Sequence, residues 1–123
     1  MNYQQDEAKL QRTMERIRAC NYLTVTQIFL KDNFLLERPL AFDDVKPRLL
    51  GHWGTCPGIN LVYASMRNVF ADQKEQTTFV LGPGHGFPAL QANLFYDGDL
   101  AAVDSTLSRD YAGLAKISEL FSR

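Results

Sequence analysis

Hydrophobic residues recur at the spacing of a helix face in four parts of the chain, and one short run has the composition of a buried strand. The first helical pattern extends from about Asp6 to Cys20. Within it, Leu10, Met14 and Ile17 stand four and three residues apart and are surrounded by charged side chains. This pattern predicts an amphipathic helix.

Residues 23–30 form an apolar run whose pattern does not decide between a helix and a strand. Its β-branched side chains favour a strand, while Asp32 and Asn33 suit the end of either element. The stretch that follows contains Pro39 and leads into Pro47, and each proline disfavours helix in the residue before it. We therefore expect residues 33–46 to be a loop with at most one short helical turn.

A second helical pattern extends from Ile59 to Phe70, directly after a glycine-rich turn that ends at Gly58. Thr55 precedes this pattern and is a candidate N-cap. The spacing of the apolar residues predicts one buried face along the helix. The residues expected on that face are Ile59, Val62, Tyr63, Met66 and Val69.

The run Thr77–Leu81 is short, β-branched and apolar, and it is followed by the turn Gly82-Pro-Gly84. These features predict a buried strand. Pro88 then stands where a helix would begin, over Ala89–Tyr96, and Asp97-Gly98-Asp99 would end it. A last amphipathic segment has its apolar side chains at Tyr111, Leu114, Ile117 and Phe121.

Helix, strand, glycine turn and helix in this order are typical of an α/β unit. A single buried strand must pair with another strand, so either residues 23–30 form a second strand or the chain is part of a larger sheet. We therefore expect an α/β fold, mainly helical with one short strand of the parallel type, in a single partial domain over residues 1–123.

Composition narrows the classes of partner. The chain of 123 residues carries 13 basic and 14 acidic side chains, a formal charge of −1, which leaves no basic surplus for nucleic acid or an anionic membrane. No apolar stretch approaches the roughly 20 residues of a spanning helix, and the polar start lacks the layout of a signal peptide. We expect a cytoplasmic protein without a metal site, whose Cys20 and Cys56 are reduced thiols.

The turn Gly82-Pro-Gly-His-Gly86 has a glycine at every second position, directly after the predicted strand. Such glycines allow close approach of a ligand and direct N–H groups at an anion. The spacing is not that of a Rossmann motif, and no Walker lysine is present. His85 follows the predicted strand at the point where open α/β sheets bind ligands. The alternative is a tight turn whose histidine caps a helix.

A second glycine-rich turn, Gly51–Gly58, carries His52 beside Trp53, the one tryptophan of the chain. Two imidazoles in such loops suit hydrogen bonding to phosphate or sugar hydroxyls and proton transfer near neutral pH. The alternative is that Trp53 anchors the loop in the core and His52 satisfies a backbone carbonyl. Cys56 has no base nearby, so the sequence gives little support to a nucleophilic cysteine.

Four segments together carry a resemblance to a known family: Cys20–Asn33, Asp44–Gly58, Val80–Gly86 and Tyr96–Gly98. In their order and spacing, they resemble the N-terminal part of the thiamine-diphosphate-dependent phosphoketolases. These enzymes cleave xylulose 5-phosphate or fructose 6-phosphate with phosphate to give acetyl phosphate. A looser similarity links the glycine–histidine turns to transketolases. The resemblance implies a partial thiamine-diphosphate-binding fold in which residues 23–30 are helical.

The resemblance also implies roles for the two turns. His52 would line the sugar-phosphate channel and assist proton transfer, and His85 would lie beside the cofactor diphosphate and stabilise developing charge. Both histidines would be catalytic, with thiamine diphosphate and Mg²⁺ as the cofactors of the family. The implied substrate-binding residues are His52, Gly54 and Thr55, and the implied cofactor-binding residues are Gly82, Gly84, His85 and Gly86.

Three positions depart from the family pattern. Phe87 precedes Pro88 where the family usually has glycine, Ser65 stands where it has histidine, and the pair Arg67-Asn68 is inverted. Phosphoketolases are also several-fold longer, and their metal-diphosphate motif and the carboxylate that activates the thiamine ring lie beyond the matching segment. We therefore expect no catalysis by this chain alone.

Three functional hypotheses follow. The first is a fragment of a phosphoketolase that acts with the remaining phosphoketolase domains on a sugar phosphate and phosphate. The second is a non-catalytic relative that binds or regulates a phosphoketolase subunit, and the third is a small anion-binding module. The expected partners include a second copy of the chain but neither nucleic acid nor membrane.

Overall fold

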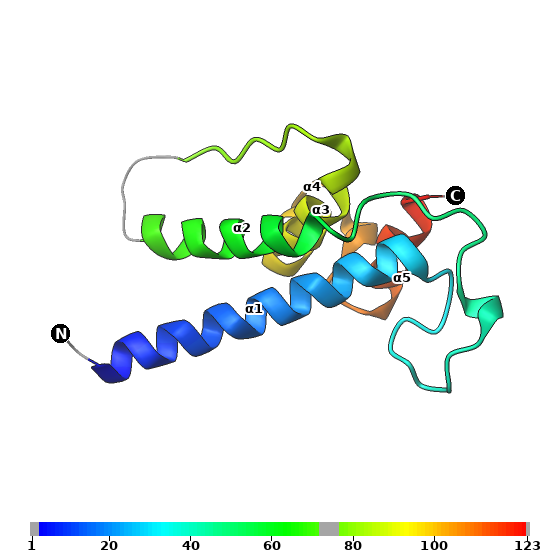
Figure 1. The fold of residues 1–123 in the computed structure, drawn as a ribbon, viewed down its shortest axis with the longest axis horizontal. Helices are drawn as coiled ribbons and strands as arrows, with labels where there is room; N and C mark the ends of the chain where they lie inside the picture. The colour runs from blue at the N-terminus through cyan, green and yellow to red at the C-terminus, as the bar shows by residue number, and fades with distance from the viewer. Residues whose placement is uncertain (1–2, 72–76, 123) are drawn as a thin grey trace.

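The computed structural model describes residues 3–71 and 77–122, and over these residues it is a set of helices joined by loops (Figure 1). Five α-helices and three short 3₁₀ turns follow one another in the described part. They are α1 (Tyr3–Phe29), η1 (Phe42–Asp44), α2 (Cys56–Phe70), η2 (Gly84–Gly86), α3 (Phe87–Asp97), α4 (Asp99–Val103), η3 (Ser105–Leu107) and α5 (Tyr111–Leu120).

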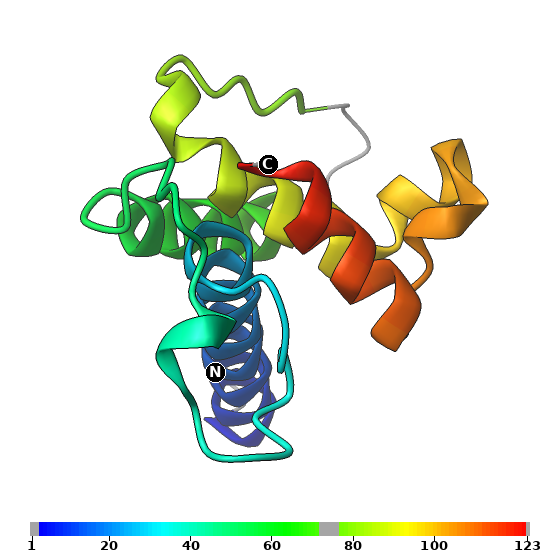
Figure 2. The same ribbon diagram turned by 90° about the vertical axis from the view of Figure 1, so that its right-hand side faces the viewer.

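The long helix α1 organises the molecule. It contacts α2 between about Lys9 and Thr24, α3 over its second half from Arg16 to Gln27, and also α5. Figure 2 shows that α4 and η3 lie on the far side of α3 and α5 from α1. The second half of α1 is therefore the part of the chain around which the other long helices pack.

The prediction of an α/β fold is wrong for the described residues, which contain no strand. Residues 77–81 are extended, but their backbone groups form no ladder, and Val80 is 82% exposed. The phenyl ring of Phe79 packs edge-on against Tyr63, with 5.0 Å between ring centroids. The β-branched composition thus favours an extended backbone, but a strand also needs a neighbour, and the described chain supplies only an isolated bridge between Leu30 and Val45.

Residues 23–29 are helical, as the family resemblance implies, and they form the end of α1. The hydroxyl groups of Thr24 and Thr26 donate to the carbonyl oxygens of Cys20 and Leu23, at 2.7 and 2.9 Å. These local bonds satisfy both hydroxyls inside a buried helix. The β-branched run can therefore be helical although its composition favours a strand.

The predicted helix boundaries hold where the chemistry of a turn sets them. Pro88 lies in the first turn of α3, and Gly98, with φ of +86°, ends that helix in the left-handed conformation. Asp110 caps α5, because its carboxylate accepts the N–H of Gly113 at 2.9 Å. Thr55 precedes α2 but does not cap it, since its hydroxyl donates to the carbonyl of His52 instead.

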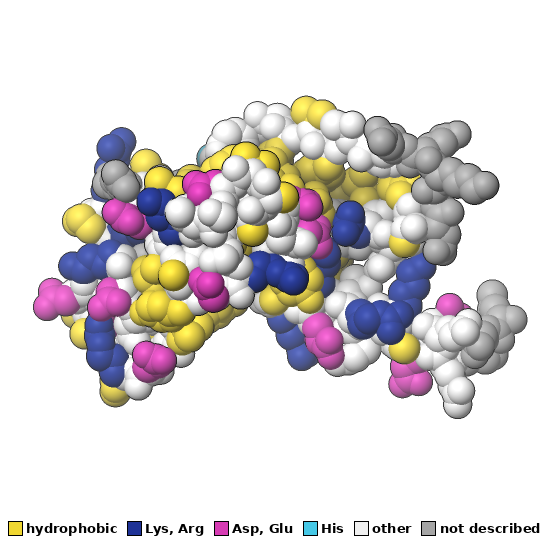
Figure 3. Space-filling model, turned by 180° about the vertical axis from the view of Figure 1, so that it is seen from behind, with side chains coloured by type: hydrophobic (Ala, Val, Ile, Leu, Met, Phe, Trp, Pro, Cys, Tyr) yellow, Lys and Arg dark blue, Asp and Glu magenta, His cyan; other side chains and the backbone are white. Residues whose placement is uncertain are grey.

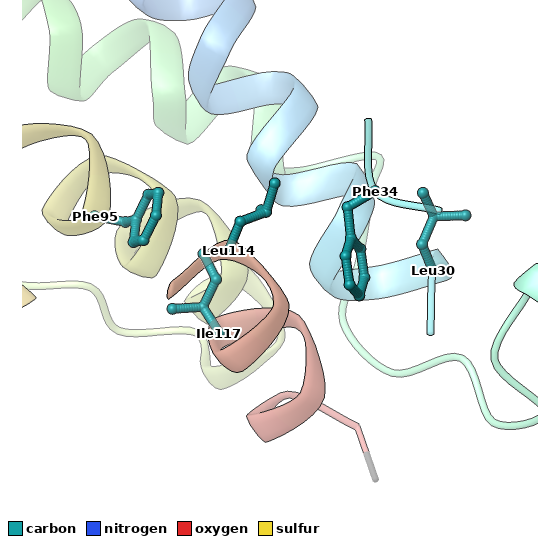
Figure 4. Packing of buried hydrophobic residues seen from close by; sticks show 5 residues of the cluster. All are labelled: Leu30, Phe34, Phe95, Leu114 and Ile117. Atoms are coloured by element: carbon teal, nitrogen blue, oxygen red, sulfur yellow. The ribbon is translucent and has the colours of Figure 1, made fainter. Parts of the chain in front are cut away.

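The apolar faces predicted from spacing are only partly buried. Leu10 and Met14 of α1 and Val62 and Val69 of α2 are each more than 40% exposed. The main core lies instead where the end of α1, α3 and α5 meet (Figure 4), and a smaller cluster joins Ile28, Cys56 and Ala89. The residues of the main cluster are Leu30, Phe34, Phe95, Leu114 and Ile117.

A buried polar network links α1, α2 and α3. The side-chain amide of Asn93 donates to Asn60 at 2.7 Å, and its carbonyl oxygen accepts from Arg16 and from the thiol of Cys20, each at 3.3 Å. Arg16 also forms a bidentate ion pair with Asp97, with both contacts at 2.7 Å. Side chains from all three helices are thus joined by hydrogen bonds in a buried or partly buried region.

Lys46 ties a long loop to two helix ends. Its buried ammonium group donates to the carbonyl oxygens of Gln27, at 2.7 Å, and of Ser118 and Phe121. The first is in the last turn of α1 and the other two are at the end of α5, where carbonyl groups lack helical partners. One lysine therefore satisfies acceptors at two helix C-termini and holds residues 45–47 between them.

Replacing Lys46 by methionine should destabilise the fold strongly. Methionine keeps the apolar part of the side chain but leaves three buried carbonyl groups without a donor, which we expect to lower the free energy of unfolding by about 3 kcal/mol. Urea unfolding followed by circular dichroism measures the change. The matched control is Lys31→Met at an exposed position, which should change stability by no more than about 0.5 kcal/mol. Equal stability of the two variants would contradict the capping role.

The Cys20 thiol should make the chain less stable in alkaline solution than a variant without this thiol. Burial raises the pKa of this thiol from an ordinary value near 9 to about 12. Above pH 9 this thiol therefore loses its proton in the unfolded chain but keeps it in the folded chain, and its contribution to folding stability declines by about 1.4 kcal/mol per pH unit until the folded thiol ionises. Burial lowers the pKa of Lys46 to about 8, which acts in the opposite direction but equally in the parent and in Cys20→Ser. Between pH 8 and pH 10.5, the free energy of unfolding of the parent should fall by about 2 kcal/mol relative to that of Cys20→Ser. Parallel pH profiles would show that Cys20 ionises as readily in the folded chain.

Candidate functional site

The fold brings the two glycine–histidine turns together. The imidazole rings of His52 and His85 lie edge to face, with 5.4 Å between their centroids, and both side chains are exposed. The backbone N–H of His52 donates to the carbonyl oxygen of His85 at 2.9 Å. Two segments more than 30 positions apart in the sequence therefore form one local structure with a pair of adjacent imidazoles at its surface.

Gly51 adopts the left-handed backbone conformation that starts the turn carrying His52. Its φ of +87° is in the left-handed region, where glycine is favoured, and a β-carbon there would lie 3.1–3.2 Å from Pro88, Ile28 and Phe121. Two backbone N–H groups, of Thr55 and Cys56, then donate to the carbonyl oxygen of His52 at 3.1 and 3.2 Å. The turn is closed by its own backbone and seated against the core.

The glycines of the site have different surroundings. A β-carbon on Gly54 would lie 2.7 Å from Cε1 of His52, so the imidazole packs over the space that this glycine leaves. Gly82 and Gly84 are exposed and border open space, with nothing within 4 Å of such a β-carbon. Gly86 is buried, and its β-carbon would meet Ile59 at 2.5 Å. The structure thus offers open backbone at Gly82 and Gly84 and close packing at Gly86.

Each histidine lies directly before a helix. α2 begins at Cys56, four residues after His52, and α3 begins at Phe87, two residues after His85. Helix N-termini carry unpaired N–H groups and the positive end of the helix dipole. In this chain the N–H groups of Cys56 and Phe87 already donate to the carbonyl oxygens of His52 and Gly84, and the prolines that follow have no N–H. The positive ends of the two helix dipoles and the two imidazoles still favour an anionic ligand.

Two aromatic side chains border the site. Trp53 is 37% exposed, which does not support the alternative in which it anchors the loop in the core. The ring of Phe87 stacks on Phe121, with 6.3 Å between centroids, and it remains 42% exposed. The bulky residue at this family glycine position is therefore accommodated by α5 and the chain after it.

Other candidate chemistry finds no support in the described residues. Cys56 is fully buried, and burial raises the pKa of its thiol, so the nucleophilic thiolate is disfavoured. In the described ranges, no three His, Cys, Asp or Glu side chains come together as a metal ion requires. A search of the described helices also found none with the length and apolar character needed to cross a membrane.

Comparison with known proteins decides the family. The chain matches the XFP N-terminal domain over residues 4–123. It belongs to the phosphoketolase family. A probable phosphoketolase of Pseudomonas putida is 50% identical over 105 residues, which are 85% of this chain and 13% of the relative. A probable phosphoketolase of Mycobacterium avium is 49% identical over the same shares. A probable phosphoketolase of Gloeobacter violaceus is 43% identical over 93% of this chain and 14% of its own length.

This phosphoketolase-family chain thus spans about one-seventh of the length of these relatives. The resemblance read from its motifs is confirmed, whereas the roles of His52, Gly54, Thr55, Gly82, Gly84, His85 and Gly86 stay predictions. The contact between the two turns could not be predicted from the sequence. Its one available signal was that each histidine stands beside a glycine, and spacing along the chain does not report which turns meet in space.

Replacing Gly54 by alanine should displace the His52 imidazole without unfolding the chain. The new methyl group would lie 2.7 Å from Cε1, and the exposed imidazole can rotate away, at a cost of less than about 1 kcal/mol. Loss of the nuclear Overhauser effect between the two imidazoles would report the movement. The matched control is Gly58→Ala in α2, where nothing lies within 4 Å. It should keep the ring contact and stabilise the helix by about 0.5–1 kcal/mol. An unchanged ring contact in Gly54→Ala would contradict the packing described.

Proposed function

We propose that this chain forms one wall of a phosphoketolase active site, which acts on xylulose 5-phosphate or fructose 6-phosphate and phosphate and produces acetyl phosphate. The observation that carries the proposal is the adjacency of His52 and His85, whose rings are 5.4 Å apart in exposed turns. Family membership supports the same reaction class. His52 is the proposed contact to substrate hydroxyls, together with the exposed Gly54 and the half-buried Thr55.

The residues around His85 fit the diphosphate group of thiamine diphosphate. Gly82 and Gly84 border open space, so the backbone can approach phosphate oxygens, and the N-terminus of α3 follows two residues later. His85 would donate to the same oxygens, while buried Gly86 lets the first turn of α2 pack close to the turn. When bound, this cofactor would supply a nucleophilic ring carbon.

The two imidazoles would have different roles in the reaction. An exposed imidazole can both donate and accept a hydrogen bond, so His52 can orient a sugar hydroxyl and exchange a proton with it. His85, closer to the diphosphate, would stabilise negative charge that develops near the reacting carbon. Since the chain spans 13–14% of its relatives, further groups of the active site would come from the rest of a phosphoketolase.

A second candidate function is a non-catalytic role, in which the chain binds or regulates a phosphoketolase subunit. The observation that favours it is Phe87, whose exposed ring stands beside the His85 turn where the family usually has glycine. A bulky ring at this position leaves less room for a ligand to approach the backbone of the His85 turn. The two candidates differ in whether the turns support turnover once the rest of an enzyme is supplied.

The proposal is tested in a chimera, in which this chain replaces the matching segment of the Pseudomonas putida relative. We expect the chimera to form acetyl phosphate from xylulose 5-phosphate and phosphate, and the isolated chain to form none. In the chimera, His52→Asn and His85→Asn should each lower kcat/KM at least about 100-fold, because each removes a group that moves a proton or stabilises charge. Acetyl phosphate is measured as its hydroxamate.

The control is Val103→Thr, a substitution at an exposed position of α4 that should leave the rate unchanged. A folded chimera without activity would favour the non-catalytic candidate. Full activity in both histidine variants would contradict the roles proposed for the two imidazoles.

A further inference from the structure

The loop between α1 and α2 exposes an unusual number of large apolar side chains. Phe42, on η1, is 98% exposed and is the most exposed large hydrophobic residue of the described chain. Each of the other three members of the set is more than half exposed. The apolar loop, as we call residues 31–44, presents Leu35, Leu36, Leu40 and Phe42.

The apolar loop is held in one conformation. Leu30 and Val45 close its base through a backbone bridge, and Asp44 accepts two hydrogen bonds from Arg38, at 2.5 and 2.8 Å, and one from the backbone of Ala41 at 2.8 Å. Leu36 has a φ of +52°, which is unfavourable for a non-glycine residue. A buried carboxylate and a strained backbone thus hold the apolar side chains toward solvent, and strain of this kind is typical of functional segments.

Charged residues are interspersed with the apolar ones along the loop. They are Lys31, Asp32, Glu37, Arg38 and Asp43, all of them exposed. Figure 3 shows hydrophobic and charged side chains interspersed at the end of the molecule farthest from the N-terminus. Exposed apolar side chains among charged ones are compatible with a protein–protein interface, and an exposed aromatic residue such as Phe42 is of the type enriched in such interfaces.

We propose that the apolar loop docks, with Phe42 as its anchor, into an apolar pocket on the remaining polypeptide of a phosphoketolase. This inference rests on the proposed function, because the partner surface is the part of a phosphoketolase that this chain does not span. About six-sevenths of each relative lies outside the matched segment. Ser122, near the end of the matched segment, donates to the carbonyl of Arg48, and Lys46 donates to that of Phe121, so the polypeptide that follows in a phosphoketolase starts near the base of this loop.

The test uses thiol labelling of Phe42→Cys, in the isolated chain and in the chimera with the Pseudomonas putida relative. Cys20 and Cys56 are fully buried, so they give a slow background. In the isolated chain, Phe42→Cys should react as fast as Val103→Cys, which replaces a residue that is 90% exposed. In the chimera, the Phe42→Cys thiol should react at least about ten-fold more slowly, because it is reached only when the contact opens.

A labelling rate in the chimera equal to that in the isolated chain would overturn the docking proposal, whether or not the chimera is active. Slow labelling in an inactive chimera would support docking while the proposed reaction fails. Labelling of the isolated chain that slows as its concentration rises would mean that a second copy covers the loop, and would overturn the proposal as well. Leu40→Cys provides a second labelling site if Phe42→Cys does not fold.

Discussion

The hydrogen bond between the side chains of Asn93 and Asn60 fixes the relation between α2 and α3, and the candidate site depends on that relation. The bond is buried and 2.7 Å long, and a shift of either helix would leave a buried amide without its partner, at a cost of about 1–3 kcal/mol. His52 stands four residues before α2 and His85 two residues before α3. The buried bond sets the position of α2 relative to α3. It therefore also sets the distance between the two imidazoles, which lie before the N-termini of these helices.

Lys46 connects this site to the apolar loop. It follows the bridge residue Val45 at the base of the loop, and five residues later Gly51 begins the turn that carries His52. Its ammonium group holds this part of the chain against the ends of α1 and α5, and Phe121, which it contacts, is also a neighbour of Gly51 and of Phe87. The same buried charge thus positions a candidate docking surface on one side and a candidate ligand site on the other.

Local chemistry in the sequence predicted much of this fold, and the failures concern contacts between distant residues. Pro88 and Gly98 bound α3 as expected, because the effect of each acts within one turn. Residues 23–30 remained ambiguous, since a threonine hydroxyl can satisfy itself inside a helix or lie in a strand. The strand at Thr77–Leu81 was predicted wrongly, because composition reports a preference for extended backbone but not the presence of a partner. Both histidines were singled out from their glycines, but the backbone bond between their turns has no local signal.

The described residues leave the candidate site open to water. His52, Gly54, Gly82 and His85 are all exposed, and the α2 and α3 N-termini approach a ligand from the protein side alone. Chemistry that generates a reactive carbon nucleophile needs a site from which water is excluded, because water weakens every electrostatic contact and quenches the nucleophile. The described side chains provide hydrogen-bond donors and one surface of the site, but they do not shield it from water. Under the proposed function, that cover would come from polypeptide of the remaining phosphoketolase that packs over the histidine turns.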